Sequence, residues 1–218
     1  MLIGTVAKTQ RFRNVECPQG AEAILVGCWW LLREIELASL KGADFRFSDG
    51  PGCGRAEVRI RASKADTEAA GCTREHACIC PSGICPVKAA RALTHGKAAD
   101  ELVLQNKDGS GLSKRATVRL VKAFASSQDC DTARVTGHSM RTSGAQHLAD
   151  AGLSTEQIKM FGRWGSTSNM AKYTREAHIR PGVIADALIK RQRAAPSLPR
   201  ELARTRWNRL RSDRIAGG

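Results

Sequence analysis

Aromatic residues and long apolar segments are both scarce in this chain. Phe, Trp and Tyr make up 5% of the 218 residues, and Tyr173 is the only tyrosine. The longest apolar stretch, Ala23 to Leu32, is far shorter than the roughly 20 residues that a membrane-spanning helix needs. The first residues, through Lys8 and Arg11, contain no apolar core of a secretory signal. We therefore expect an intracellular protein with no membrane partner.

Acidic residues are also few relative to basic ones. Lys and Arg number 35 against 21 Asp and Glu, which gives a formal net charge of +14. Such an excess favours a polyanionic partner, because contact with phosphates releases their bound counterions. The basic residues are spread along the chain and not gathered on one amphipathic helix, which favours nucleic acid over an anionic membrane surface. An alternative is that the charge serves solubility only.

Cysteine is comparatively abundant, with eight residues in the chain. In an intracellular protein these are expected to be reduced thiols. Five potential metal ligands lie within fourteen residues: Cys72, His76, Cys78, Cys80 and Cys85. Their spacing is irregular compared with paired zinc knuckles, so we expect a loop of free thiols and assign no metal. A small zinc-bearing binding module centred on Cys72 to Cys85 is the alternative.

The apolar periodicity predicts a mainly α fold with a small antiparallel β-sheet. We expect one long helix over 21–40, strands over 44–47 and 57–61, and a partner strand after Gly71. Further helices are predicted over these ranges: 85–93, 114–124 capped by Ser113, 141–151, a segment opened by the capping box Ser154 to Gln157, and 182–193. We divide the chain into a leader or truncated linker (1–19), one catalytic domain (20–193) and a basic flexible tail (194–218).

The strongest local pattern is His138 and Arg141 three residues apart, Trp164 a further 23 residues on, and Tyr173 nine beyond that. His138 and Arg141 are expected on one face at the start of a helix, where backbone N–H groups favour a nearby phosphate. Trp164 can donate one hydrogen bond, and a tyrosine hydroxyl can act as a nucleophile. Taken one by one, these residues are better explained as a helix cap (His138), a surface cation (Arg141) and a core side chain (Tyr173).

Taken together, they resemble the active-site block of the tyrosine recombinases, the phage integrase family. Trp164 stands where most relatives have His and the Cre-like members have Trp. The segment "LLREIELASL" resembles the block with the first catalytic arginine, which implies that role for Arg33 and a supporting role for Glu36. The segment "RIRASKAD" matches the family's β-hairpin lysine at Lys64. The resemblance covers about residues 20–190.

The resemblance implies a DNA breaking and rejoining enzyme without metal or other cofactor. Tyr173 would form a 3′-phosphotyrosyl link to double-stranded DNA, and the chain would act as a homo-tetramer on DNA in the nucleus or nucleoid. Six residues would be catalytic: Arg33, Lys64, His138, Arg141, Trp164 and Tyr173. Only about twenty residues stand before the block, where the family has an N-terminal DNA-clamping domain. A truncated or decayed DNA-binding protein that no longer cleaves, and a topoisomerase of type IB, are therefore the alternatives.

Overall fold

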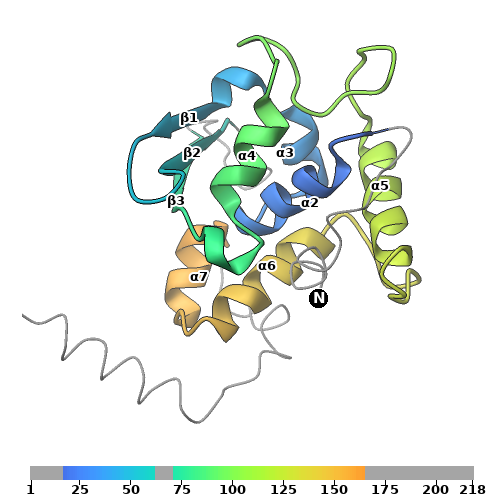
Figure 1. The fold of residues 1–218 in the computed structure, drawn as a ribbon. Coiled ribbons are helices and arrows are strands. Elements are labelled where there is room, and N and C mark those ends of the chain that lie inside the picture. The colour runs from blue at the N-terminus through green and yellow to red at the C-terminus, as the bar shows by residue number, and fades with distance from the viewer. Residues whose placement is uncertain (1–16, 62–70, 165–218) are drawn as a thin grey trace, which may run out of the picture. The chain divides into compact units, whose positions relative to one another are not determined.

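The computed structural model describes residues 17–61 and 71–164. Within these ranges the chain forms six α-helices and a three-stranded antiparallel sheet, which lies at one side of the helices (Figure 1). The helices are α2 (Gly20–Trp29), α3 (Glu34–Ser39), α4 (Pro86–Thr94), α5 (Lys114–Ser126), α6 (Ser139–Asp150) and α7 (Thr155–Gly162). The strands are β1 (Phe45–Ser48), β2 (Arg55–Ile60) and β3 (Cys72–Ala77), with short 3-10 helices η1 (Gly42–Asp44) and η2 (Cys80–Ser82). The predicted fold class, mainly α with a small antiparallel sheet, is confirmed.

The sheet has the order β1-β2-β3, with Phe45 opposite Val58 and Ile60 opposite Cys72. Burial alternates along β2, where Ala56, Val58 and Ile60 face the core. This is the pattern expected of a strand with one covered face. Helix α4 packs against β2 and β3. Residues 62–70, which include Lys64, join β2 to β3 and lie outside the described ranges.

Helix α2 forms the centre of the helical core. Nine of its ten residues are buried, as expected for a helix that is apolar on nearly every side. It contacts α4, α6 and α5, which surround it in Figure 1. Gly144 of α6 permits the close approach of α6 to α2, because a Cβ at this position would overlap the carbonyl oxygen of Cys28.

The predicted single helix over 21–40 is wrong, because the chain turns between α2 and α3. Leu31 adopts a left-handed conformation with φ of 51°. The Leu31 N–H donates to the Cys28 carbonyl (3.2 Å), and the Leu32 N–H donates to the Gly27 carbonyl (2.8 Å). This is the Schellman pattern that ends a helix, here with leucine in the position usually held by glycine. A non-glycine residue in this conformation costs about 1–2 kcal/mol, so the surrounding packing must stabilise it.

Two predicted helix starts, at Ser113 and at Ser154, are confirmed by their caps. The Ser113 hydroxyl accepts the Ala116 N–H (3.2 Å) at the start of α5. At the start of α7, Ser154 and Gln157 exchange hydrogen bonds of 2.8 and 3.2 Å, which is the predicted capping box. Helix α6 ends just before Gly152, whose φ is 91°. These caps fix the ends of the helices that carry Arg141 and lead to Trp164.

No helix among the described residues is long and apolar enough to cross a membrane. The predicted helix over 182–193, the tail over 194–218 and nearly all of the leader fall outside the described residues. The domain boundaries at 19/20 and 193/194 therefore stay predictions.

Candidate active site

Glu36 of α3 is the centre of a buried ion cluster. Its side chain is 2% exposed, and its carboxylate accepts hydrogen bonds from three arginine side chains. Arg33 donates through Nη1 to Oε1 (3.1 Å), and its backbone N–H donates to Oε2 (2.8 Å). Arg141 donates through Nη2 to Oε2 (3.2 Å). Arg163 forms a fork, with Nη1 to Oε1 (3.3 Å) and Nη2 to Oε2 (3.0 Å). We call these four residues the guanidinium cluster.

The turn after α2 supplies a further acceptor to the guanidinium cluster. The Leu31 carbonyl accepts Nε of Arg141 (2.7 Å) and Nη2 of Arg163 (3.4 Å). The left-handed conformation of Leu31 thus has a structural consequence, since it directs this carbonyl toward two guanidiniums. The same turn places Arg33 at the N-cap of α3 with an extended backbone. Its contact with Glu36 is therefore part of the start of α3.

The end of α7 brings Arg163 and Trp164 to the cluster. Arg163 caps the helix in a left-handed conformation, with φ of 60°. The Arg141 guanidinium carbon lies 5.3 Å from the Trp164 ring centroid, in a cation–π contact. Gly162 makes room for this ring, because a Cβ there would overlap it. Trp164 is therefore packed against the arginine that it was expected to accompany.

The guanidinium cluster carries excess positive charge. Three guanidiniums share one carboxylate, which leaves two positive charges uncompensated within these four residues. Arg141 is fully buried, whereas the Arg33 and Arg163 side chains are 21% and 13% exposed. Arginine forks match the oxygens of a phosphate, and such charge-assisted hydrogen bonds are strong. The cluster can therefore bind a phosphodiester from its partly exposed side.

Glu34 holds the segment before α6 against α3. Its carboxylate is buried, and Lys114 of α5 approaches Oε1 at 3.3 Å. Gly137 packs directly on this carboxylate, where a Cβ would overlap it. Oε2 of Glu34 has no hydrogen-bond partner among the described residues. A second carboxylate on the same short helix therefore positions the chain that leads into His138.

The structure brings together four of the predicted site residues, Arg33, Glu36, Arg141 and Trp164. His138 is exposed at the N-cap of α6, and its ring has no hydrogen bond to another described residue. Lys64 and Tyr173 lie outside the described residues. Arg163 was missed by the sequence reasoning. Its only sequence signal is its place directly before Trp164.

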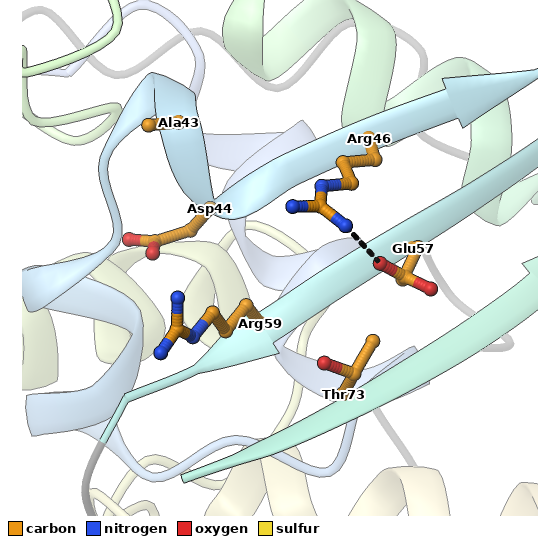
Figure 2. Close-up of a pocket in the computed structure, with 6 residues that line it drawn as sticks. All are labelled: Ala43, Asp44, Arg46, Glu57, Arg59 and Thr73. Atoms are coloured by element: carbon orange, nitrogen blue, oxygen red, sulfur yellow. Dashed lines mark ion pairs between the residues drawn. The ribbon is translucent and has the colours of Figure 1, made fainter.

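A shallow pocket of about 200 Å³ lies elsewhere, over η1 and the sheet. Figure 2 shows the residues that line it: Ala43, Asp44, Arg46, Glu57, Arg59 and Thr73. Arg46 pairs with Glu57 at 3.9 Å, and Asp44 also accepts Nε of Arg61 (2.6 Å). Both acidic residues of the lining thus have an arginine partner, and the pocket shares no lining residue with the guanidinium cluster. We do not assign the chemistry to it.

Comparison with known proteins decides the family. The sequence profile of the phage integrase family matches residues 30–179, more than half of the chain. The chain belongs to the phage integrase family. The matched range includes all six residues proposed as catalytic, from Arg33 to Tyr173. A comparison with curated protein sequences finds no match.

Solved structures of recombinases share the fold. One is the XerH site-specific recombinase in a post-cleavage complex with palindromic difH substrate. Its TM-score is 0.58 at 17% identity, over 84% of this chain and 50% of that chain. Another is the XerA recombinase, with a TM-score of 0.55 at 13% identity, over 90% of this chain and 61% of that chain. The chain thus spans about half the length of XerH, and at these identities the likeness concerns the fold.

Proposed function

We propose that this protein breaks and rejoins double-stranded DNA through a covalent link to Tyr173. The guanidinium cluster carries this proposal. Its three arginines surround one carboxylate, so these four residues carry two more positive than negative charges. This excess favours binding of a phosphodiester. The overall charge of +14 favours DNA as the source of that phosphate.

Each proposed role follows from the chemistry of the side chain. The Tyr173 hydroxyl attacks the scissile phosphorus and forms a new P–O bond, and the bond from phosphorus to the 5′ oxygen breaks. Lys64 gives a proton to the departing 5′ oxygen, and His138 accepts the tyrosine proton or hydrogen-bonds the phosphate. Rejoining is the reverse, with a 5′ hydroxyl attacking the phosphotyrosyl link. The link conserves the bond energy, so the reaction needs no nucleotide cofactor.

The arginines stabilise the charge that develops on the non-bridging oxygens. The Arg33 guanidinium is partly exposed. The buried Arg141 guanidinium is held in place by hydrogen bonds to Glu36 and to the Leu31 carbonyl. Groups fixed before the reaction stabilise a transition state without reorganisation. In this proposal Glu36 and Arg163 are positioning residues, and Trp164 packs on Arg141 and donates its indole N–H toward the phosphate. Strand exchange between two duplexes would require a tetramer of this chain on DNA.

The test is covalent capture from a pool of DNA sites. The full chain is incubated with duplexes of randomised sequence, each with a nick beside the position to be cleaved so that rejoining is prevented. Adducts stable to denaturant are isolated, and their DNA is sequenced. The proposal predicts adducts enriched in one sequence and their loss in Tyr173→Phe. This variant removes one hydroxyl group, so its DNA binding serves as the folding control.

The alternatives give different results in this assay. A decayed, non-cleaving protein would bind DNA equally with and without the Tyr173 hydroxyl and would form no adduct. A topoisomerase of type IB would form the adduct and relax a supercoiled plasmid, but would join no strands from two duplexes. Adduct formation followed by strand exchange between two labelled duplexes carrying the enriched site is the result that the proposed recombinase activity predicts.

A further inference from the structure

Four cysteines from three separate segments meet at one end of the sheet. Cys53 lies in the turn between β1 and β2, Cys78 and Cys80 follow β3, and Cys85 stands at the N-cap of α4. Their sulfur atoms all lie within 4.8 Å of one another. The individual Sγ–Sγ distances are 3.0 Å (Cys78 to Cys80), 3.5 Å (Cys53 to Cys80 and to Cys85) and 4.0 Å (Cys78 to Cys85).

These distances fit the edges of a tetrahedron around one metal ion. A Zn–S bond of about 2.3 Å in tetrahedral geometry places the sulfurs about 3.8 Å apart. A disulfide instead joins two sulfurs at about 2.05 Å and has no role for a third or fourth. All eight cysteines are free thiols in this structure. Four thiolates around Zn²⁺ form a closed structural site.

The surrounding backbone is arranged for sulfur ligands. Gly52 has φ of 68°, and a Cβ there would approach the Cys78 sulfur to 2.5 Å. The Cys78 N–H donates to the Gly54 carbonyl (2.9 Å), which ties the two turns together. The Cys80 N–H donates to the Cys78 sulfur (3.4 Å), a contact that stabilises a thiolate. Cys85 has its sulfur at the start of α4, where the helix dipole also favours negative charge.

The two other candidate ligands of this region lie apart from the four sulfurs. Cys72 pairs with Ile60 at the far end of the β2–β3 ladder, five residues along β3 from Ala77. His76 has Nε2 at 2.9 Å from the Trp29 carbonyl, and its ring contacts the rings of Trp29, Trp30 and Phe161. The crowded segment of the sequence thus contributes three sulfurs, and the fourth comes from Cys53.

We propose that Cys53, Cys78, Cys80 and Cys85 bind one Zn²⁺ in a closed tetrahedral site. Cysteine sulfurs occupy all four coordination positions of the ion, so the ion has a structural role and leaves no coordination position for a substrate or water. It joins the β1–β2 turn, the segment after β3 and the start of α4, and so fixes the sheet to the helical core. The site lies at the opposite end of the β2–β3 hairpin from the connection that holds Lys64.

The first test uses the unmodified chain. The full-length protein is purified without chelator, and its metals are quantified by mass spectrometry, with an expected content of about one zinc per chain. Pulsed alkylation then compares the cysteines residue by residue. Cys53, Cys78, Cys80 and Cys85 should react at least about tenfold faster after a chelator is added, whereas Cys72 and Cys130 should react at the same rate in both conditions.

Single variants make the second test. Cys53→Ser and Cys80→Ser should lose the bound zinc and lower the Tm by about 10 °C or more, as removal of a structural metal does. Cys72→Ser and Cys130→Ser change thiols of similar exposure outside the cluster and should keep both metal and Tm. Because the ligand variants could lose metal by unfolding, cobalt is also added to the chelated wild-type chain. A tetrahedral tetrathiolate absorption spectrum is expected.

Three results would overturn the proposal. One is a folded wild-type chain without zinc in which the four cysteines react as fast as Cys72. The second is a disulfide between any two of the four in protein purified under reducing conditions. The third is stoichiometric iron in place of zinc, which would overturn the choice of metal. None of these readouts depends on DNA cleavage, so the zinc site and the recombinase proposal can fail separately.

Discussion

The guanidinium cluster and the four-cysteine cluster are built in opposite ways. The first places three cations around one carboxylate, and the second places four thiols, each able to become an anion, within 4.8 Å of one another. The guanidinium cluster therefore favours binding of an anion, and the four-cysteine cluster favours binding of a cation. The guanidinium cluster is partly open, since the Arg33 side chain is 21% exposed, whereas the protein closes all four positions of the cysteine cluster. An open cluster suits a ligand that binds and leaves, and a closed one suits an ion that stays.

The two clusters also depend on different parts of the fold. The guanidinium cluster depends on the turn at Leu31 and on the close approach of α6 to α2. The cysteine cluster depends on the register of a hairpin and on the start of α4. We therefore expect substitutions in one cluster to leave the other intact, and the following variants test that separation.

The largest effect is expected for Arg33→Ala. It removes the most exposed guanidinium of the cluster, and loss of one such group commonly slows a reaction about 10²- to 10³-fold. Stability should change by less than about 1 kcal/mol, because the Arg33 pair with Glu36 is partly solvated. Single-turnover cleavage of the captured site and urea unfolding measure the two quantities. Arg46→Ala, which removes an exposed arginine of β1, is the matched control and should cleave at the wild-type rate.

Glu36→Gln is expected to destabilise the fold. It removes the carboxylate that contacts Arg33, Arg141 and Arg163, and unpairing buried charge costs about 3–5 kcal/mol. Urea unfolding should show this loss, whereas Glu57→Gln, in a half-exposed pair with Arg46, should cost less than about 1 kcal/mol. Zinc content should remain that of the wild type. Equal stability of the two variants would mean that the cluster does not hold α3 to α6.

Gly144→Ala tests the approach of α6 to α2. The added Cβ would overlap the Cys28 carbonyl oxygen, and overpacking of this kind costs about 1–3 kcal/mol. Because Arg141 lies on the same helix, cleavage should slow as well, while the metal content of the cysteine cluster stays unchanged. Gly50→Ala is the control, since a Cβ there meets only ordinary contacts. A drop in zinc content with Gly144→Ala would show that the two clusters are coupled.

The smallest effect is expected for Arg163→Lys. The charge is kept, but a single ammonium cannot contact both Glu36 oxygens and the Leu31 carbonyl as the fork does. We expect a loss of about 1 kcal/mol in unfolding free energy and a modest fall in cleavage rate with little change in DNA affinity. An equal fall in affinity and rate would instead mean that Arg163 contacts DNA directly.

The sequence predicts the elements well, because their signals are local. Ser113, Ser154 and Gln157 mark helix starts, and the alternation along β2 marks a half-buried strand. The break at Leu31 has no such signal. Apolar residues continue through it with helical spacing, and the left-handed position holds leucine where glycine would have been recognisable.

The same limit applies to the clusters. The family pattern predicted Arg33, Glu36, Arg141 and Trp164. Arg163 joins the guanidinium cluster because α7 ends at this residue in a left-handed conformation, and no sequence pattern marks that helix end. Cys53 could not be grouped with Cys78 from spacing alone. The two meet because Arg55 pairs with Ala77 in the antiparallel ladder, and strand prediction does not give that register.

Because Tyr173 is the only tyrosine in the chain, the amino acid that carries the DNA link can be identified chemically. A cleavage substrate with radioactive phosphate at the scissile position is trapped on the protein, digested with nuclease and hydrolysed to amino acids. We predict labelled phosphotyrosine, which can come from no other residue, and none from Tyr173→Phe. Label on another amino acid, or DNA bound without any transfer of label, would contradict the account.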